Sequence, residues 1–292
     1  RDNAFLPQSV RDRMIAANLL ARGTLAPVVE GVDCIVHAAA GMRGAAADMF
    51  ANSVLGTRNL LEAACAAGVR RVVLVSSFSV YRAEHLARGA VLDESVPLEE
   101  DGVKRGSYGF AKTQQEKIFD EFRARHGFEG VVLRPGVIYG PGGGALSQRI
   151  GLSAMGVFVS LGGPAILPLT HVKNCADAIA VAALKAAPGS VFNVVDDDLP
   201  TCAEYLRLYR KNVKPLRVIR LPYPLFLWSS KLLESYHKRS KGQLPAVFTP
   251  YVVRSMYRPL RYSNAALKAL GWKPGVSTAE GLEATWKALR GT

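Results

Sequence analysis

Tyr108 and Lys112 stand four residues apart in a stretch whose pattern predicts a helix. Side chains at this spacing share one face of a helix, so the phenol and the ammonium are expected to be neighbours. A nearby positive charge favours the phenolate and would lower the pKa of Tyr108 from about 10, which would let it act as a base near neutrality.

Hydroxyl side chains end a second motif, because the apolar run 72–75 predicts a strand that is followed by Ser76 and Ser77. Together with Tyr108 and Lys112, this pattern indicates hydride chemistry on a carbonyl or an alcohol. Another interpretation stays open at this point, in which Ser77 caps a strand end and Tyr108 and Lys112 are a surface pair, because short motifs also arise by chance.

Strands and helices alternate over the first two thirds of the chain. Gly68 is expected to end one helix at its C′ position, and Ser107 and Asn174 are expected as N-caps of two others. The pattern predicts an α/β protein with an open, mostly parallel sheet and helices on both faces. The predicted strands are 32–38, 71–76, 130–134 and 190–195, and the predicted helices are 45–67, 107–126 and 174–187.

The regular alternation weakens after residue 196, where prolines punctuate short helices. We therefore predict two parts: residues 1–196 form the sheet domain, and residues 197–292 mainly form a small substrate-binding cap. In folds of this class, ligands bind at the carboxyl edge of the sheet, so the cap is expected over that edge.

The composition of the 292 residues, with 49% apolar and 21% charged side chains, is ordinary for a soluble globular protein. The net charge of +13 is compatible with a basic solvated surface, an anionic cofactor or substrate, or peripheral contact with an anionic membrane. Nucleic acid is not an expected partner, because the one dense basic cluster, 238–241, lacks interleaved aromatic residues.

The four cysteines form no Cys-x-x-Cys pair and no cluster with zinc spacing, so no metal site is expected. Cys34 and Cys65 lie in apolar runs and are therefore expected to be free thiols in the core. Free thiols suit a reducing, cytoplasmic location. The uncharged segment 151–170 is long enough to span a bilayer, but its glycines and prolines favour a buried loop and strand.

Seven segments, in their order along the chain, resemble the extended short-chain dehydrogenase/reductase superfamily, which includes NAD-dependent epimerases and dehydratases. The resemblance covers nearly the whole sequence and implies a Rossmann-like, doubly wound parallel sheet with a small C-terminal cap, and NAD or NADP as cofactor. The segments are 31–40, 52–64, 76–81, 108–112, 133–142, 171–178 and 270–274.

The resemblance also implies the catalytic roles. Tyr108 matches the base, Lys112 matches its partner that also reaches the ribose hydroxyls, and Ser77 matches the hydroxyl that donates to the substrate oxygen. Asn52 matches the active-site asparagine, which orders a water in the proton path. In the late Val-x-Asp motif of the family, Asn174 replaces the aspartate.

The cofactor site implied by the resemblance involves small residues after a strand and the run that packs on the nicotinamide. The family's first strand and its Gly-x-x-Gly-x-x-Gly loop have no counterpart in this sequence, so we expect a truncated first unit and weak or absent dinucleotide binding. The implied cofactor residues are Arg1, Asn18, Leu19, Ala38, Ala39, Ala40, Ser76, Tyr108, Lys112, Pro135, Gly136 and Val137.

The substrate pocket is expected to be apolar, because the stretches 164–170 and 221–228 carry no charge. An apolar pocket favours a hydrophobic secondary alcohol or ketone, such as a sterol, as the substrate. In this respect the sequence resembles the 3β-hydroxysteroid dehydrogenase branch of the superfamily. Two alternatives remain: a nucleotide-sugar epimerase or dehydratase in which Arg149 or Arg254 holds a diphosphate, and a non-catalytic dinucleotide-binding or scaffold protein. The predicted substrate residues are Ser77, Phe78, Tyr139, Arg149 and Trp228.

A homodimer is a further expectation. The predicted helices 45–67 and 107–126 resemble the helices through which superfamily members pair, and both carry alanine-rich faces that allow close packing.

Overall fold

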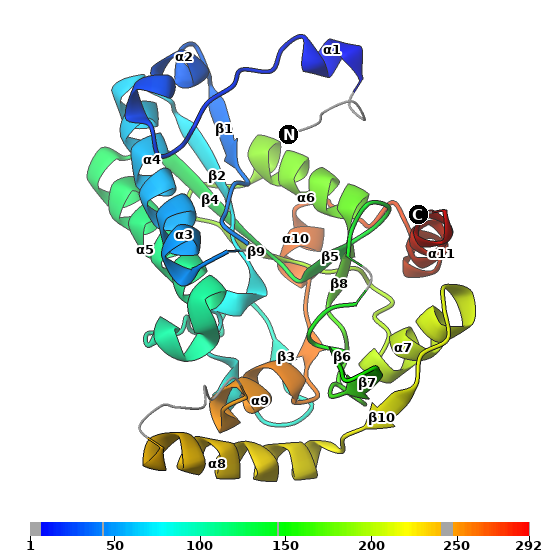
Figure 1. Ribbon diagram of the computed structural model, residues 1–292. Coiled ribbons are helices and arrows are strands. Elements are labelled where there is room, and N and C mark those ends of the chain that lie inside the picture. The colour runs from blue at the N-terminus through cyan, green and yellow to red at the C-terminus, as the bar shows by residue number, and fades with distance from the viewer. Residues whose placement is uncertain (1–6, 43, 145, 241–247, 292) are drawn as a thin grey trace.

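A four-stranded parallel sheet forms the centre of the protein. The computed structural model describes residues 7–42, 44–144, 146–240 and 248–291 (Figure 1). Every neighbouring pair of strands in the central sheet is parallel, which confirms the predicted α/β class. The strand order is β1 (Cys34–His37), β2 (Arg71–Val75), β4 (Glu129–Pro135) and β9 (Val191–Val194).

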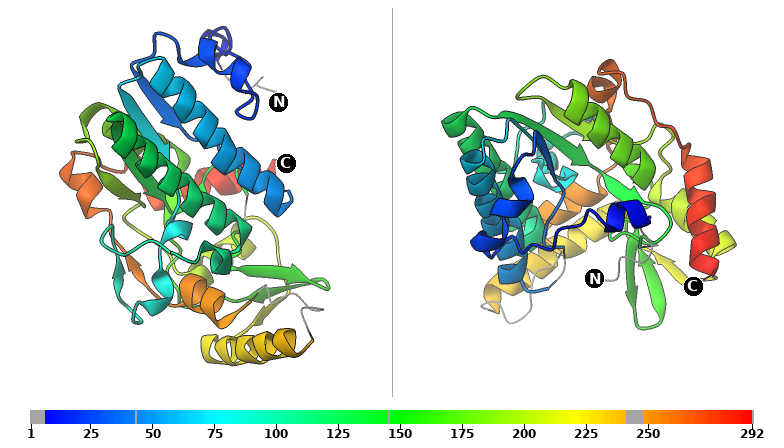
Figure 2. Two further views of the ribbon diagram at one scale, coloured as in Figure 1. Left: turned by 90° about the vertical axis from the view of Figure 1, so that its left-hand side faces the viewer. Right: turned by 90° about the horizontal axis from the view of Figure 1, so that it is seen from above.

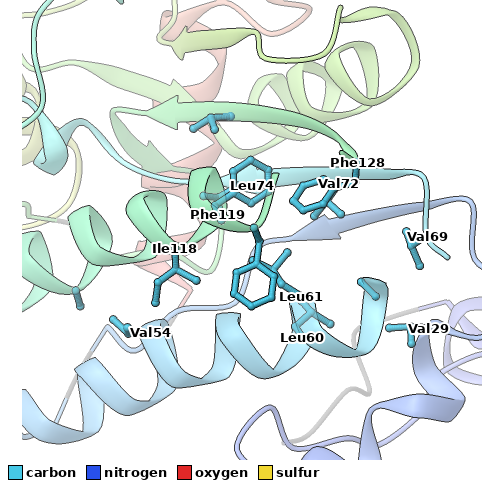
Figure 3. Close-up of a cluster of buried hydrophobic side chains, with 14 residues drawn as sticks. Val29, Val54, Leu60, Leu61, Val69, Val72, Leu74, Ile118, Phe119 and Phe128 are labelled. Atoms are coloured by element: carbon cyan, nitrogen blue, oxygen red, sulfur yellow. The ribbon is translucent and has the colours of Figure 1, made fainter. Parts of the chain in front are cut away.

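Helices cover both faces of this sheet, as a doubly wound fold requires. Alternate side chains of a strand point to opposite faces, and β2 shows this directly. Val72 and Leu74 pack with Leu61 and Phe119 (Figure 3), whereas Val73 belongs to the buried cluster on the opposite face. The helices on the first face are α4 (Gly56–Ala66) and α5 (Gly106–His126), and those on the second are α6 (Val172–Lys185) and α10 (Ala265–Ala269).

The helix expected over 45–67 forms as three consecutive pieces: α3 (Ala46–Phe50), a π-helical turn (Ala51–Leu55) and α4. It ends before Gly68, whose φ of 72° lies in the left-handed region that glycine adopts without strain. The expected C′ position of Gly68 is therefore confirmed.

Both predicted N-caps are wrong. Helix α5 begins at Gly106, directly after a 3₁₀ turn (Gly102–Arg105), so Ser107 lies inside its first turn. Helix α6 begins at Val172, and the buried Asn174 is used elsewhere: its amide donates to Asp196 and to the carbonyl of Val276.

Three small sheets lie beside the central one. In the uncharged segment 151–170, the structure has an antiparallel hairpin and a loop, and no helix of the described residues is both long and apolar enough to cross a bilayer. The hairpin strands are β6 (Gly151–Ala154) and β7 (Val157–Ser160), with β10 (Val218–Arg220) beside β7; the other pairs are β5 (Val137–Tyr139) with β8 (Leu169–His171) and β3 (Val91–Leu92) with β11 (Arg261–Tyr262).

The pairing of β7 with β10 crosses the predicted boundary at residue 196, and α10 packs back onto the central sheet. The division into two parts stays a prediction. Figure 2 shows the sheet, its helices and the C-terminal elements from two further sides. The remaining helices are α1 (Gln8–Arg11), α2 (Ala26–Val29), α7 (Cys202–Asn212), α8 (Tyr223–Arg239), α9 (Pro250–Tyr257) and α11 (Thr278–Arg290).

A buried ion pair joins α5 to β4. The guanidinium of Arg134 donates to both carboxylate oxygens of Glu116, at 3.1 and 2.7 Å, and both side chains are almost fully buried. The same guanidinium lies 4.8 Å from the ring centre of Tyr81, whose hydroxyl donates to Asn193 on β9. One charge pair thus fixes a helix, two strands and a loop against each other.

Removing one member of this pair should strongly destabilise the fold. We expect Glu116→Met to lower the free energy of unfolding by about 3–5 kcal/mol, because Arg134 would remain as an unpaired buried charge. The double variant Glu116→Met/Arg134→Met should recover most of this loss. Asp101→Asn serves as the control, since it breaks an exposed pair with Lys104 and should leave the free energy of unfolding nearly unchanged. Urea unfolding measures all three; a Glu116→Met effect no larger than the control would contradict the assignment.

Candidate active site

A cavity of about 610 Å³ opens at the carboxyl ends of β2 and β4. This is the edge at which ligands bind in open α/β sheets. The loop after β2, the start of α5, the segment after β4 and residues from more distant parts of the chain form its wall. The lining residues are Met42, Met49, Ser76, Ser77, Phe78, Ser79, Arg105, Tyr108, Gly109, Pro135, Gly136, Val137, Ile138, Ser147, Gln148, Arg149 and Met256.

Tyr108 and Ser77 both line this wall, and both side chains are half-buried. Burial raises the pKa of Tyr108 above its ordinary value, and the nearby Ser77 hydroxyl opposes this rise without cancelling it. The phenol is therefore protonated at neutral pH in the free protein. The expectation that Lys112 lowers the pKa of Tyr108 is wrong for this state.

The position of the Lys112 ammonium explains this difference. Its Nζ donates to the carbonyl of Val75 and to the Gln115 side chain, each at 2.8 Å, and the residue is 3% exposed. These bonds use two of the three N–H donors of the ammonium. Burial lowers the pKa of Lys112 to about 8, against the opposing effect of the Glu116 carboxylate.

A buried polar cluster holds Lys112 in place. The Gln115 amide donates to Thr57 on α4 at 2.8 Å and lies 3.1 Å from Nε2 of His37 at the end of β1. Burial, and secondly the charge of Lys112, lower the pKa of His37 to about 4, so the imidazole is neutral at pH 7. Gln115 and Thr57 carried no sequence signal, because a lone glutamine or threonine has no distinctive spacing.

Several predicted cofactor residues lie together at this edge. Ala38 and Ala39 are exposed directly after β1, and Pro135, Gly136 and Val137 line the cavity. A Cβ atom on Gly136 would lie 2.2 Å from the carbonyl oxygen of Pro168, so only glycine allows this close approach.

The hydroxyl of Ser76 is buried beside the cavity and finds no hydrogen-bond partner among the described residues. An orphaned hydroxyl of this kind is suited to a bound polar ligand. The small residues after β1, the tight turn at Gly136 and this hydroxyl fit the nicotinamide end of a dinucleotide.

Other predicted residues lie away from the cavity or outside the described part. Arg1 lies outside the described residues. Asn18 is exposed and its side-chain oxygen accepts from the amide of Leu20, while Leu19 packs against the core beside α4. Ala40 is half-buried and does not line the cavity.

Asn52, Tyr139 and Trp228 also do not line the cavity that Tyr108 lines. Asn52 is exposed and donates to the carbonyl of Asp48 within its own helix. Tyr139 is buried with its ring against His171, and Trp228 is exposed on α8. A helical or strand pattern predicts which face a residue occupies, but it does not predict which distant element that face meets.

The cavity carries more charge than the sequence predicted. Arg105 and Arg149 line it, and none of the described lining residues is acidic. Of the predicted substrate residues, Ser77, Phe78 and Arg149 line the cavity, whereas the apolar stretch 164–170, Phe226 and Trp228, which were expected to form its wall, do not. Arg105 donates to the carbonyl of Ser79 at 2.9 Å and Arg149 to that of Met256 at 3.2 Å, so both are positioned by neutral acceptors.

Comparison with known proteins agrees with this architecture. The sequence model of the NAD dependent epimerase/dehydratase family matches residues 1–194. The chain belongs to this family. Its members are NAD-dependent by description, which agrees with the expected cofactor class.

Two characterised relatives are similar over much of their length. A 3-diazoavenalumate denitrifying reductase from a Streptomyces species is 30% identical over 227 residues, covering 73% of this chain and 71% of the relative. A 4-hydroxy-2-methyl-3-oxo-4-farnesyl-3,4-dihydroquinoline-1-oxide ketoreductase from Stigmatella aurantiaca is 29% identical, covering 96% and 84%. The solved UDP-glucose 4-epimerase of Thermus thermophilus, in complex with NAD, shares the fold with a TM-score of 0.72 at 19% identity, covering 100% of this chain and 88% of that one.

The buried ammonium of Lys112 should make stability depend on pH. Between pH 8 and 10.5 the unfolded chain binds more protons at this lysine than the folded chain, so its contribution to stability rises with pH. Relative to Lys112→Met, the wild-type free energy of unfolding should therefore increase across this window, by an amount on the order of 3 kcal/mol. Urea unfolding at several pH values measures the difference. Lys117→Met, which removes an exposed lysine of α5, is the control and should show no such rise; parallel pH profiles for wild type and Lys112→Met would contradict the buried charge.

Proposed function

We propose that this protein is an NAD(P)-dependent oxidoreductase that interconverts a hydrophobic ketone and the corresponding secondary alcohol. The observation that supports this most directly is that Tyr108 and Ser77 both line the wall of one largely apolar cavity. Family membership supports the dinucleotide, and the cavity supports the substrate class.

Bound NAD(P) would supply or accept the hydride, held by the residues after β1 and by the turn at Gly136. In the direction of reduction, the protonated phenol of Tyr108 donates its proton to the carbonyl oxygen as negative charge develops there. Ser77 donates a hydrogen bond to the same oxygen, which stabilises that charge. One proton and one hydride convert the carbonyl to an alcohol.

Lys112 is expected to act from the protein interior, on the side of Tyr108 and Ser77 away from the cavity. Its buried ammonium bonds to the carbonyl of Val75, directly before Ser76 and Ser77, and thereby positions the start of α5, which carries Tyr108, against the end of β2. The cluster of Gln115, Thr57 and His37 fixes its position, so the orientation of the ammonium does not depend on solvent.

The walls of the cavity favour an apolar substrate. Met42, Met49, Phe78, Ile138 and Met256 present hydrocarbon and thioether groups toward the space beside Tyr108. Burying such surface stabilises a bound ligand by about 25 cal/mol per Å². The similarity to a ketoreductase whose named substrate carries a farnesyl group is in keeping with this class.

A nucleotide-sugar epimerase or dehydratase is the second candidate, and the arginines favour it. Arg105 and Arg149 are the cations of the lining, and a diphosphate would balance their charge. We rank it second because each guanidinium is already positioned by a backbone carbonyl and because the rest of the wall near Tyr108 is mostly apolar.

The homodimer through α3, α4 and α5, and the cytoplasmic location, stay predictions. These helices form a layer on one face of the sheet (Figure 2).

Replacing Tyr108 by phenylalanine should remove the proton donor alone. We expect turnover of ketones with NADH or NADPH to fall by about 10²–10⁴-fold, while dinucleotide affinity changes by no more than a few fold. Steady-state kinetics and cofactor titration measure the two effects, with Tyr236→Phe on α8 as the control. Full activity in Tyr108→Phe would overturn the mechanism, and absence of turnover in wild type with intact dinucleotide binding would favour a non-catalytic role.

Calorimetric titration should separate the two substrate classes. We expect a sterol ketone to bind with a negative change in heat capacity, because apolar surface is buried, and UDP to bind weakly. Arg149→Ala should leave sterol binding within a few fold, as should Arg207→Ala on the exposed side of α7. Tight UDP binding that is lost in Arg149→Ala but kept in Arg207→Ala would establish the nucleotide-sugar class instead.

A further inference from the structure

Helix α8 carries an exposed apolar stripe on the outside of the molecule. Leu225, Trp228, Leu232 and Tyr236 follow each other at intervals of three, four and four residues, so they share one helix face, and all four are exposed. Phe226 and Ser230, on the opposite face, are buried. Figures 1 and 2 place α8 along one edge of the protein.

The charges around this stripe are positive. Lys231, Lys238 and Arg239 are exposed on α8, and Arg220 is exposed shortly before it. The one acidic residue of the helix, Glu234, is half-buried and lies 3.5 Å from Lys238. An apolar stripe with tryptophan, tyrosine and leucine, flanked by basic side chains, is the pattern of a helix that lies in the plane of a membrane interface.

Two further cavities with shared lining residues lie between the inner side of α8 and the candidate active site. A second cavity, of about 620 Å³, shares Arg105, Gln148 and Met256 with the wall around Tyr108. A third, of about 360 Å³, shares Leu152 and Phe248 with the second and is lined from α8 by Phe226, Ser229, Ser230 and Leu233. The helix with the exposed stripe therefore also lines, on its inner side, the outermost of these three neighbouring cavities.

We propose that the outer face of α8 binds the surface of an anionic phospholipid membrane. The basic side chains would meet the lipid headgroups while Leu225, Trp228 and Leu232 enter the headgroup–acyl boundary. A second copy of the chain fits this face less well, because pairing would bring basic residues together with almost no acidic partner. If the proposed function holds, a lipophilic ketone dissolved in the membrane would reach Tyr108 through the adjoining cavities.

Trp228 makes the binding directly observable. The chain has three tryptophans, and Trp228 is 58% exposed while Trp272 and Trp286 are 1% and 4% exposed. Insertion of α8 should shift the emission of Trp228 to shorter wavelength with vesicles of equal parts phosphatidylcholine and phosphatidylserine. Vesicles of phosphatidylcholine alone should produce a smaller shift, and added salt should weaken binding because it screens the charges.

Two pairs of variants isolate the apolar and the charged contributions in a vesicle sedimentation assay. Leu232→Ser should weaken binding by about tenfold or more, as loss of one buried leucine implies, whereas Leu184→Ser, which alters an exposed leucine of α6, should not. Lys231→Glu should weaken binding at least about fivefold, whereas Lys117→Glu on α5, with the same change in net charge, should weaken it less.

Absence of binding to anionic vesicles, or binding that Leu232→Ser and Lys231→Glu leave unchanged, would overturn the proposal. Self-association seen by light scattering without vesicles, and abolished by Leu232→Ser, would assign this face to contact between copies instead. The assay uses neither substrate nor cofactor, so its result is independent of the Tyr108→Phe experiment.

Discussion

The ion pair between Glu116 and Arg134 is the interaction on which the arrangement of the site depends. Both charges are almost fully buried, which is unfavourable because they lose their hydration. The two hydrogen bonds between the guanidinium and the carboxylate, and the contact of the guanidinium with the ring of Tyr81, offset this loss. Arg134 comes directly before the Pro135–Gly136 turn that lines the cavity, and Glu116 lies one turn after Lys112 on the same helix. A shift of α5 along β4 would break the pair, so the pair fixes the distance between the two halves of the site.

Glu116 also acts on the lysine. Its carboxylate opposes the desolvation that lowers the pKa of Lys112, so the same residue supports both the fold and the charge state of a candidate catalytic group. A buried ammonium is unfavourable for folding, and the bonds to Val75 and Gln115 offset only part of that cost. Stability is thus reduced beside the candidate catalytic residues, a compromise that is common at active sites.

A second buried polar residue, Asn174, links the C-terminal third of the chain to the central sheet through hydrogen bonds. Asn174 bonds to Asp196, which follows β9, and to both backbone groups of Val276, while the indole of Trp272 donates to the carbonyl of Asn174. The hairpin of β6 and β7 pairs with β10, and β10 is followed in the chain by α8. The parts of the chain that surround the cavity are therefore held by contacts over long sequence separations, and α8, at the edge of this assembly, is left with one face uncovered.

Local features of this protein could be predicted from the order of its residues. The apolar run of β2, the left-handed position of Gly68 and the spacing of Tyr108 and Lys112 are local properties, because side-chain period and backbone freedom act within a few residues. Three features follow from the tertiary structure alone: the inward position of the Lys112 ammonium, the use of Asn174 as a hydrogen-bonding link instead of an N-cap, and the place of Arg105 on the cavity wall. These outcomes depend on which distant groups meet and how much water they exclude, and neither quantity is encoded in the spacing of residues along one helix or strand.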